Sequence, residues 1–368
     1  MLANNAGHTR DIPLSFECFP LIVGWELTLR CNLRCAHCGS SAGYSRLQEL
    51  TLREAENICD QFPDLLVQEV TFTGGEPLLS AYWYELANRI HKLDIDVKIL
   101  SNGIALSRDI VSQMQDVGLR GIGISLDGLA ATHDRLRGKD GLFNCLLEKM
   151  DMIQAVGLPL TVITTVHAQN IQELPQILEI LASKGIQFWQ IQPIFHLGRA
   201  ADNERLQLSN SQFLELGDFV SQWSNHALAK GLKILPSDSY GYFTFRDTRE
   251  PAWNGCPAGI LSCGITSDGK VKGCLSLPNH LIEGDLRIDT LWDIWFKPDA
   301  FSYTRHFSNA DLGPNCISCD LAEQCLGGCS AMSFGCTNRF HNNPFCFYRI
   351  DNTARTRGEE AHPKGAVH

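Results

Sequence analysis

Residues 31–38 read CNLRCAHC and place three cysteines, Cys31, Cys35 and Cys38, within eight residues. The stretch directly follows an apolar, strand-like segment at residues 23–29. A closed structural metal site needs four protein ligands, whereas this loop supplies three. Three thiolates suit an iron–sulfur cluster that keeps one iron open for another molecule. The alternatives are a zinc site with a distant fourth ligand and a group of buried core cysteines.

The chain around this loop alternates between strand-like and helix-like segments. Apolar runs bounded by turn residues predict six strands, and helical periods separate them. Thr51 and Glu54 form a capping-box signature at the start of the first helix. This alternation predicts an α/β fold with a parallel sheet, here a curled, partial (β/α)6 TIM-like barrel. The predicted strands span 23–29, 69–73, 96–100, 121–126, 160–166 and 188–193, and the predicted helices lie near 51–62, 80–92, 107–117, 142–156, 171–184 and 210–230.

The stretch TFTGGEPLL (71–79) follows the second predicted strand. In a barrel of parallel strands the chemistry lies at the carboxyl ends of the strands, so this is a favourable place for a functional motif. Gly74 and Gly75 allow the backbone to approach a ligand closely, and Glu76 can accept hydrogen bonds from an ammonium group. The alternative is an ordinary strand-to-helix turn.

Three further stretches follow predicted strands. ISLDGLAATHDRLRG (124–138) comes after the fourth strand and carries ionisable side chains that could contact a charged ligand, although a plain turn is the alternative. SNG (101–103) and QPIFHLGRA (192–200) follow the third and sixth strands. Their positions favour cofactor-facing turns, but we assign no individual ligand to them.

Cysteines are numerous in this chain, fifteen in all. Disulfides are rare in reducing compartments, so metal binding or redox chemistry is the better explanation. Nine cysteines lie in the last third of the chain, enough to fill two four-iron clusters, and a pair of zinc knuckles is the alternative. The cysteines of this region are Cys256, Cys263, Cys274, Cys316, Cys319, Cys325, Cys329, Cys336 and Cys346.

The composition excludes several classes of protein. The chain has 368 residues, 44% of them hydrophobic, and a formal net charge of −10. No cluster of Lys and Arg stands out, which disfavours nucleic-acid binding. No apolar stretch is long enough to span a membrane, and the N-terminus lacks the pattern of a signal peptide. We therefore expect a cytoplasmic protein with no membrane and no nucleic-acid partner.

These patterns predict four segments along the chain. An N-terminal extension (1–22) precedes the partial barrel (23–235). A loop-rich cysteine domain (236–350) follows, in which metal clusters would supply stability that a small core cannot. The polar residues 351–368 are expected to form a flexible tail.

CNLRCAHC and GGEP together resemble the radical S-adenosylmethionine (SAM) superfamily. The resemblance implies that Cys31, Cys35 and Cys38 hold a [4Fe-4S] cluster whose open iron binds the amine and carboxylate of SAM. The position before the third cysteine is usually aromatic in this family and is His37 here. The SAM-binding residues that the resemblance implies are His37, Gly74, Gly75, Glu76, Ser125, Asp127 and Arg137.

The later cysteines resemble the seven-cysteine pattern of the SPASM domain, and Cys263 adds an eighth thiolate. The resemblance implies two closed auxiliary [4Fe-4S] clusters, which makes three clusters in all. Its ligand sets are Cys256, Cys263, Cys274 and Cys329 for the first auxiliary cluster, and Cys316, Cys319, Cys325 and Cys346 for the second. The cysteines left over are Cys18, Cys59, Cys145 and Cys336.

The resemblance also implies a reaction. An electron from the cluster would cleave SAM to methionine and a 5′-deoxyadenosyl radical, which would remove a hydrogen atom from a substrate C–H bond. Similar enzymes modify ribosomally made peptides through C–C or C–S links, and this is our leading prediction. A tetrapyrrole or another small molecule is the alternative substrate. A flavodoxin or ferredoxin is the expected reductant, and a separate leader-binding protein is a further expected partner, since only about 22 residues precede the barrel.

Two other functions are less well supported by the sequence. Sulfatase-maturing relatives have an Asp directly after the cysteine of the G-x4-C segment, where this chain has Leu275. An iron–sulfur electron carrier would normally fill all of its ligand positions, which the three-cysteine loop does not do. The candidates for handling substrate protons are His167, Gln192, His196, Asp238 and Tyr240.

Overall fold

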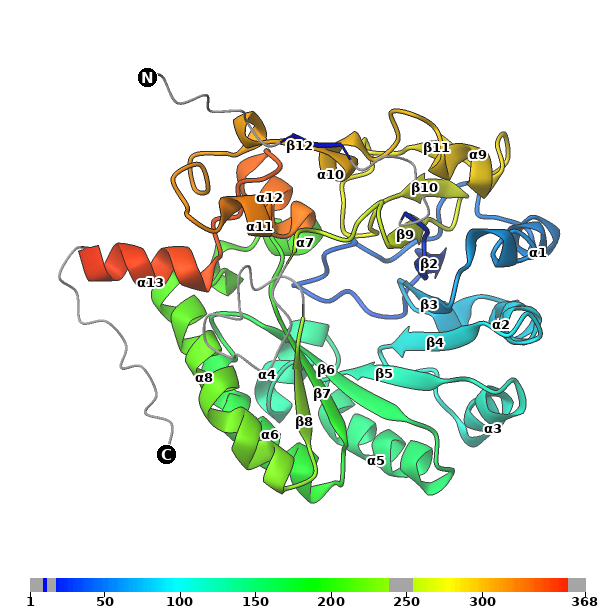
Figure 1. The fold of residues 1–368 in the computed structure, drawn as a ribbon. Coiled ribbons are helices and arrows are strands. Elements are labelled where there is room, and N and C mark those ends of the chain that lie inside the picture. The colour runs from blue at the N-terminus through cyan, green and yellow to red at the C-terminus, as the bar shows by residue number, and fades with distance from the viewer. Residues whose placement is uncertain (1–8, 12–17, 238–253, 357–368) are drawn as a thin grey trace, which may run out of the picture.

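A ten-stranded sheet organises the chain in the computed structural model, which describes residues 9–11, 18–237 and 254–356 (Figure 1). The strand order is β11-β10-β9-β2-β3-β4-β5-β6-β7-β8, and the strands from β9 through β8 run parallel. The strands are β2 (Ile22–Thr28), β3 (Glu69–Gly74), β4 (Asp96–Ser101), β5 (Gly121–Ser125), β6 (Leu160–Val166), β7 (Phe188–Pro193), β8 (Lys233–Pro236), β9 (Ser262–Ile265), β10 (Lys270–Lys272) and β11 (Gly284–Asp285).

Helices cover the outer face of the parallel strands (Figure 1). Alternate strand residues such as Val23, Trp25 and Phe72 are buried in the core between this face and the helices. The sheet does not close, so the predicted partial barrel is confirmed. The covering helices are α1 (Leu52–Cys59), α2 (Trp83–His91), α3 (Arg108–Asp116), α5 (Leu142–Ala155), α6 (Leu174–Ser183) and α8 (Asn210–Ala229).

Two short elements show how the sequence sets local structure. The predicted capping box starts α1: the Thr51 hydroxyl accepts from the Glu54 backbone N–H, and the Glu54 carboxylate accepts from the Thr51 N–H at 2.8 Å. Helix α4 (Ala130–Arg137) was not predicted as a helix and carries the second half of the stretch 124–138. It ends at Gly138, whose φ of +69° suits glycine.

The cysteine-rich segment extends the barrel sheet and does not form a separate sheet. Strand β9 pairs in parallel with β2, with Val23 opposite Cys263, and β10 and β11 follow as antiparallel strands. The predicted domain border at residue 235 therefore stays a prediction, because backbone hydrogen bonds join the two segments. The remaining elements are β1 (Thr9–Asp11), which pairs with β12 (His306–Ser308), and helices α9 (Leu291–Trp295), α10 (Ser302–Arg305), α11 (Ala322–Cys325), α12 (Ser330–Thr337) and α13 (Phe347–Thr356).

The end of the described chain differs from the prediction. Residues 351–356 continue helix α13, so the predicted flexible tail begins inside a helix. None of the helices in the part of the chain that the structure describes has the length and apolar character that a bilayer-spanning helix requires.

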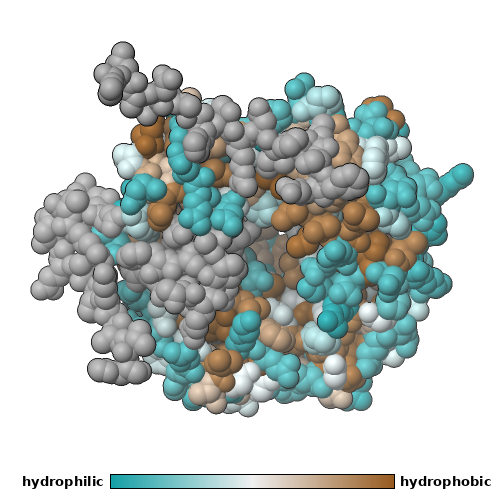
Figure 2. All heavy atoms as spheres, viewed as in Figure 1, coloured by the Kyte–Doolittle hydropathy of each residue, from teal (hydrophilic) through white to brown (hydrophobic). Residues whose placement is uncertain are grey.

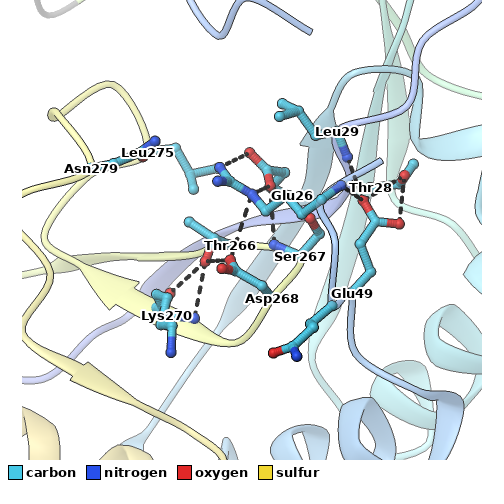
Figure 3. A network of polar contacts seen from close by, with 12 residues as sticks. Glu26, Thr28, Leu29, Glu49, Thr266, Ser267, Asp268, Lys270, Leu275 and Asn279 are labelled. Carbon is cyan, nitrogen blue, oxygen red and sulfur yellow. Dashed lines mark hydrogen bonds and ion pairs between the residues drawn. The ribbon is translucent and has the colours of Figure 1, made fainter. Parts of the chain in front are cut away.

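A polar network ties β2 to the cysteine-rich segment (Figure 3). The Glu26 carboxylate on β2 is 5% exposed and accepts from Arg46 Nε at 2.6 Å and from the Ser267 hydroxyl at 2.8 Å. Glu49 accepts from the Thr28 hydroxyl and the Leu29 N–H, both at 2.9 Å. The network therefore joins the end of β2, the segment after the cysteine loop and the turn between β9 and β10.

Removing the Glu26 carboxylate is expected to destabilise this junction. Glu26→Ala leaves Arg46 without its main partner in a mostly buried place, which we expect to cost about 3 kcal/mol. Asp60→Ala is a matched control, since it breaks the exposed pair of Asp60 with Arg89 and should cost less than about 1 kcal/mol. Urea unfolding followed by circular dichroism measures both. Equal losses in the two variants would contradict a structural role for the Glu26 network.

Candidate functional site

The cysteine loop leaves the carboxyl end of β2 and closes on itself. The Cys31 N–H donates to the Gly43 carbonyl at 3.0 Å, and the Gly43 N–H donates to the Leu29 carbonyl at 3.1 Å. Within this closed loop burial is the main cause that raises the pKa of the Cys31 and Cys35 thiols, and the nearby Cys38 thiol raises the pKa of both further. The structure therefore brings the three predicted cluster ligands together.

The two glycines of GGEP pack against the start of the cysteine loop. A Cβ atom on Gly74 would lie 2.4 Å from the Thr28 carbonyl oxygen, and one on Gly75 would lie 2.3 Å from the Arg30 carbonyl oxygen. The Gly75 and Glu76 N–H groups donate to these same two carbonyls at 2.9 Å. Only glycine allows the two turns to come this close. GGEP thus supports the cysteine loop mechanically, a role that the sequence did not reveal.

Glu76 is fully buried and orders the SNG turn. Its carboxylate accepts from the Ser101 hydroxyl at 2.9 Å and from the Asn102 N–H at 2.8 Å. Burial raises the pKa of Glu76 to about 7 in spite of these hydrogen bonds. The Asn102 side chain in turn lies 3.7 Å from the Cys31 sulfur, so the turn links Glu76 to the cysteine loop.

Asp127 is the centre of a buried charged group. Arg137 donates to its carboxylate from Nε at 2.8 Å and also from Nη2, and His37 Nε2 lies 2.9 Å from the same oxygen. The second oxygen accepts from the Thr165 N–H at 2.9 Å. Burial would raise the pKa of Asp127, but Arg137 and His37 hold it well below its usual range. Arg137 also lies 3.7 Å from the Cys35 sulfur, so this group reaches the cysteine loop.

The residues around the thiols fit a thiolate-bound cluster with a polar ligand beside it. Arg137 and Asn102 direct N–H groups at two of the three sulfurs, which suits thiolates that hold a metal cluster. His37 Nδ1 and His167 Nε2 are buried without a hydrogen-bond partner among the described residues, and the two rings lie 6.2 Å apart. Buried polar atoms normally find a partner, so these nitrogens indicate a place for a bound polar molecule.

The other predicted site residues lie on β5, on β7 and in the segment after β7, or outside the described residues. Ser125 ends β5, two residues before Asp127. Gln192 on β7 donates to the Thr165 hydroxyl at 3.1 Å, and His196 lies half-buried in the segment after β7. Asp238 and Tyr240 lie outside the described residues.

The second predicted auxiliary set is brought together. Cys316, Cys319, Cys325 and Cys346 line a single cavity, although they come from the turn at 314–319, the end of α11 and the residue before α13. Gly327 and Gly328 line the same cavity, both with positive φ, and let the chain turn tightly beside the thiols.

The first predicted auxiliary set is only partly brought together. Cys256, Cys274 and Cys329 belong to one apolar cluster, and a hydrogen bond from Cys329 contributes most to lowering the pKa of Cys256 to about 7. Cys263 belongs to a different cluster, the large core between the sheet and its covering helices. Its strand partner on β2 is Val23, and its side chain is 2% exposed. The structure therefore does not bring Cys263 to the other three thiols.

A zinc site is the alternative for these cysteine groups. A zinc knuckle places four thiolates about 2.3 Å from one ion. Across residues 9–11, 18–237 and 254–356, no three His, Cys, Asp or Glu side chains converge closely enough to hold a single metal ion.

Sequence reasoning missed three residues that contact the site. Asn102 reaches the Cys31 sulfur, His133 accepts a hydrogen bond from the Asp127 N–H at 3.0 Å, and Arg199 donates to carbonyls of the cysteine loop. Asn102 and Arg199 lie in SNG and QPIFHLGRA, whose positions after strands were noted. No sequence pattern distinguishes them from surface residues, because their partners are backbone atoms and sulfurs of another loop.

Two protein families match this chain. The sequence model of the radical SAM superfamily matches residues 25–181, and that of the SPASM iron–sulfur cluster-binding domain matches residues 256–320. The first match contains Cys31, Cys35, Cys38, GGEP and SNG, and the second contains Cys256, Cys263, Cys274, Cys316 and Cys319.

Individual proteins are similar over most of the chain. An AdoMet-dependent heme synthase of Methanosarcina barkeri is 27% identical over 351 residues, which cover 90% of this chain and 97% of the relative. The mycofactocin maturase MftC of Mycolicibacterium smegmatis is 28% identical over 326 residues, 86% and 79% of the two chains. The crystal structure of Streptococcus suis SuiB bound to its precursor peptide SuiA has a TM-score of 0.72 at 18% identity, over 85% and 72% of the chains. This last likeness shows the fold.

Cys263 provides a direct test of the auxiliary ligands. We expect Cys263→Ala to keep the full iron content after anaerobic reconstitution, because its side chain faces the barrel core. Cys274→Ala is the matched comparison and should lose up to about four irons per chain, the content of one cluster. Iron and acid-labile sulfide measured per chain distinguish the two. An equal loss in both variants would place Cys263 among the ligands.

Acid stability provides a second test. Burial lowers the pKa of His133 and of His167 to about 4, from 6.5 in the unfolded chain. The unfolded state therefore takes up protons below pH 6.5 that the folded state cannot accept until about pH 4. Folding stability is lost across this window as the pH falls, by about 3 kcal/mol for each histidine.

Replacing one histidine should reduce this loss. His133→Asn keeps an acceptor for the Asp127 N–H but does not titrate. Between pH 6.5 and about pH 5 the wild-type protein should lose about 2 kcal/mol more unfolding free energy than the variant. Urea unfolding at the two pH values measures this difference. Parallel losses in both proteins would show that His133 is not held neutral.

Proposed function

The chain belongs to the radical SAM superfamily and carries a SPASM iron–sulfur domain, and from this premise we propose that it oxidatively modifies a C–H bond of a ribosomally made precursor peptide. It is a radical SAM enzyme, so the cluster and SAM, when bound, supply the electron and the 5′-deoxyadenosyl radical. The protein supplies the position of both and the exclusion of water.

The site residues have distinct proposed roles. Cys31, Cys35 and Cys38 hold the SAM cluster. Glu76 and the Asp127 group are buried and fix the turns that surround this loop. We propose that the unpartnered nitrogen of His37 and the carboxylate of Glu76 face the bound SAM, since charged and polar groups of SAM require such partners.

We propose three clusters, and the support differs among them. The second auxiliary cluster rests on four thiols that line one cavity. The first rests on Cys256, Cys274 and Cys329 in one apolar cluster. With Cys263 in the barrel core, these three thiols are the part of the predicted first set that the structure groups.

The observation that favours a peptide is a row of neutral hydrogen-bonding side chains beside the SAM site. Gln190 Nε2 donates to Gln192 Oε1 at 3.2 Å, and Gln192 Nε2 donates to the Thr165 hydroxyl at 3.1 Å. The Thr165 N–H in turn donates to Asp127. The row lies on the strand face opposite the helix-covered core, and Figure 2 shows a hollow near the centre of this view of the molecule. Neutral amides and hydroxyls suit the amide groups of a peptide.

A second candidate substrate is an iron porphyrin. The near full-length similarity to an AdoMet-dependent heme synthase favours it. Coproporphyrin-type substrates carry several carboxylates, which arginine and lysine would bind. On the inner faces of the described strands β3 and β4, Lys98 lies 2.5 Å from Glu69, so this cation is already neutralised. The charge of this face therefore fits a peptide better.

Leu275 bears on a third substrate class. It lies over β2, with its Cδ1 atom 3.4 Å from where a Cβ on Gly24 would be. An aliphatic side chain accepts no proton, so this position gives sulfatase maturation no base.

We further propose a cytoplasmic location, a flavodoxin or ferredoxin reductant and a separate leader-binding protein, as the sequence predicts.

Substrate-dependent turnover tests the proposal. The enzyme is reconstituted anaerobically with iron, sulfide, dithionite and SAM, and 5′-deoxyadenosine is measured with a short peptide encoded beside the gene and with iron coproporphyrin. We expect the peptide to change in mass and to stimulate 5′-deoxyadenosine formation. Modification of the porphyrin alone would support the second candidate and exclude the first.

Gln192 provides the matching variant. Gln192→Leu should raise KM for the peptide about tenfold, because losing an amide that would hydrogen-bond to the bound peptide costs about 1–2 kcal/mol, and should leave SAM cleavage without substrate unchanged. Gln154→Leu is the control, since the Gln154 side chain donates to the Lys184 carbonyl, where α5 and α6 both have their carboxyl ends, away from the row. If KM is unchanged in Gln192→Leu, the row of neutral side chains does not bind the peptide.

A further inference from the structure

The segment after β7 lies between the cysteine loop and helix α12. Short helix α7 (Gly198–Ala201) begins with Gly198 at a φ of +52°, and a Cβ there would lie 2.3 Å from the Gly39 carbonyl oxygen. On the other side, a Cβ on Gly335 of α12 would lie 2.9 Å from the His196 carbonyl oxygen. Close packing on both sides holds this segment in a fixed position against the loop.

Arg199 uses this position to contact three carbonyls of the cysteine loop. Its Nε donates to Cys35 at 2.8 Å, its Nη1 donates to Ala42 at 2.9 Å, and its backbone N–H donates to Cys38 at 3.0 Å. These carbonyls are spread over the loop from its second cysteine nearly to its end. The planar guanidinium presents several donors in fixed directions, so one side chain can hold two parts of a loop at a fixed separation.

Apart from the contacts of Arg199, the hydrogen bonds within this part of the loop are long. The Cys38 N–H lies 3.4 Å from the Cys35 carbonyl, and the Ser41 N–H lies 3.3 Å from the Cys38 carbonyl. Such lengths are beyond the usual range for N–H···O bonds. The Ala36 N–H donates to Leu136 at 2.8 Å, but this contact supports the middle of the loop from the other side. Arg199 therefore makes the short hydrogen bonds between this arc and the barrel end of β7.

We propose that Arg199 is a positioning residue that holds the arc from Cys35 to Ala42 and thereby directs the Cys35 and Cys38 thiols at the SAM cluster. When this arc is displaced, the Cys35 and Cys38 thiols would no longer hold a cluster in the position that SAM binding requires. The proposal rests on the family assignment and is independent of which substrate the enzyme modifies. Arg199 acts through the loop backbone and has no contact with the thiol sulfurs among the described residues.

The test compares Arg199→Gln and Arg199→Lys with the wild-type enzyme. Arg205→Gln is the matched control, since Arg205 is an exposed arginine six residues along the same segment. Each holoenzyme is reduced with dithionite, and its electron paramagnetic resonance spectrum is recorded with and without SAM. The dissociation constant for SAM and the iron content are measured on the same preparations, and circular dichroism reports folding.

We expect both Arg199 variants to bind SAM about tenfold or more weakly and to lose most of the SAM-induced spectral change, because neither Gln nor Lys can hold both carbonyls. Their auxiliary iron should stay, and Arg205→Gln should behave as wild type. Gly198→Ala keeps Arg199 but pushes the segment away from Gly39, so it should show the same spectral loss.

Two results would overturn the proposal. One is a SAM dissociation constant within twofold of wild type in Arg199→Gln, with the normal spectral change. The other is full recovery in Arg199→Lys, which would show that the positive charge matters and the paired hydrogen bonds do not. If the Arg199 variants fail to fold, a normal SAM-induced spectrum in folded Gly198→Ala would also overturn it.

Discussion

A single buried carboxylate, that of Asp127, connects most parts of the site. It accepts hydrogen bonds from Arg137 of α4 and from the N–H of Thr165 on β6, and it pairs with His37 of the cysteine loop. A buried charge is stable only when it is paired and hydrogen-bonded. The loop after β2, the segment after β5 and the end of β6 must therefore meet at this point for the fold to be stable. The requirement that stabilises the barrel end also builds the cofactor site.

The cysteine-rich segment is joined to this centre through the backbone and through packing. Strand β9 extends the barrel sheet beside β2, and the Glu26 network joins the turn after β9 to the same strand. On the far side, α12 packs through Gly335 against the segment that carries Arg199. The cysteine-rich segment is thus connected to the cysteine loop from two directions, through β2 and through the segment that carries Arg199.

The sequence predicted the parts of this structure that depend on local pattern. The six barrel strands follow from short apolar runs, and the capping box at Thr51 and the three-thiol loop follow from spacing. Parts that depend on distant partners were not predicted. The pairing of β9 with β2 fixes which face Cys263 occupies, and no local signal reports a register between strands so far apart in sequence.

Arg199 was not predicted for the same reason. Arg199 binds the backbone carbonyl oxygens of Cys35 and Ala42. Every residue type has such an oxygen, so the sequence carries no sign of the contact. The GGEP glycines were predicted to contact SAM, and the structure adds that they pack closely against Thr28 and Arg30, which no spacing pattern indicated. Spacing patterns identify residues that bind a cofactor directly, and they do not identify the residues that hold a loop in shape.

The pairing of β2 with β9 has a consequence for the order of events during protein synthesis. Ile22 and its strand partner Ser262 are separated by 262 − 22 = 240 positions in the chain. At about 5–20 residues per second, a ribosome takes about 10–50 s to reach β9 after it has made β2. Until then β2 is an open edge strand, which can pair with other chains. The strand that leads into the cysteine loop is thus completed late, and cluster assembly in a fully supported loop follows the translation of most of the chain.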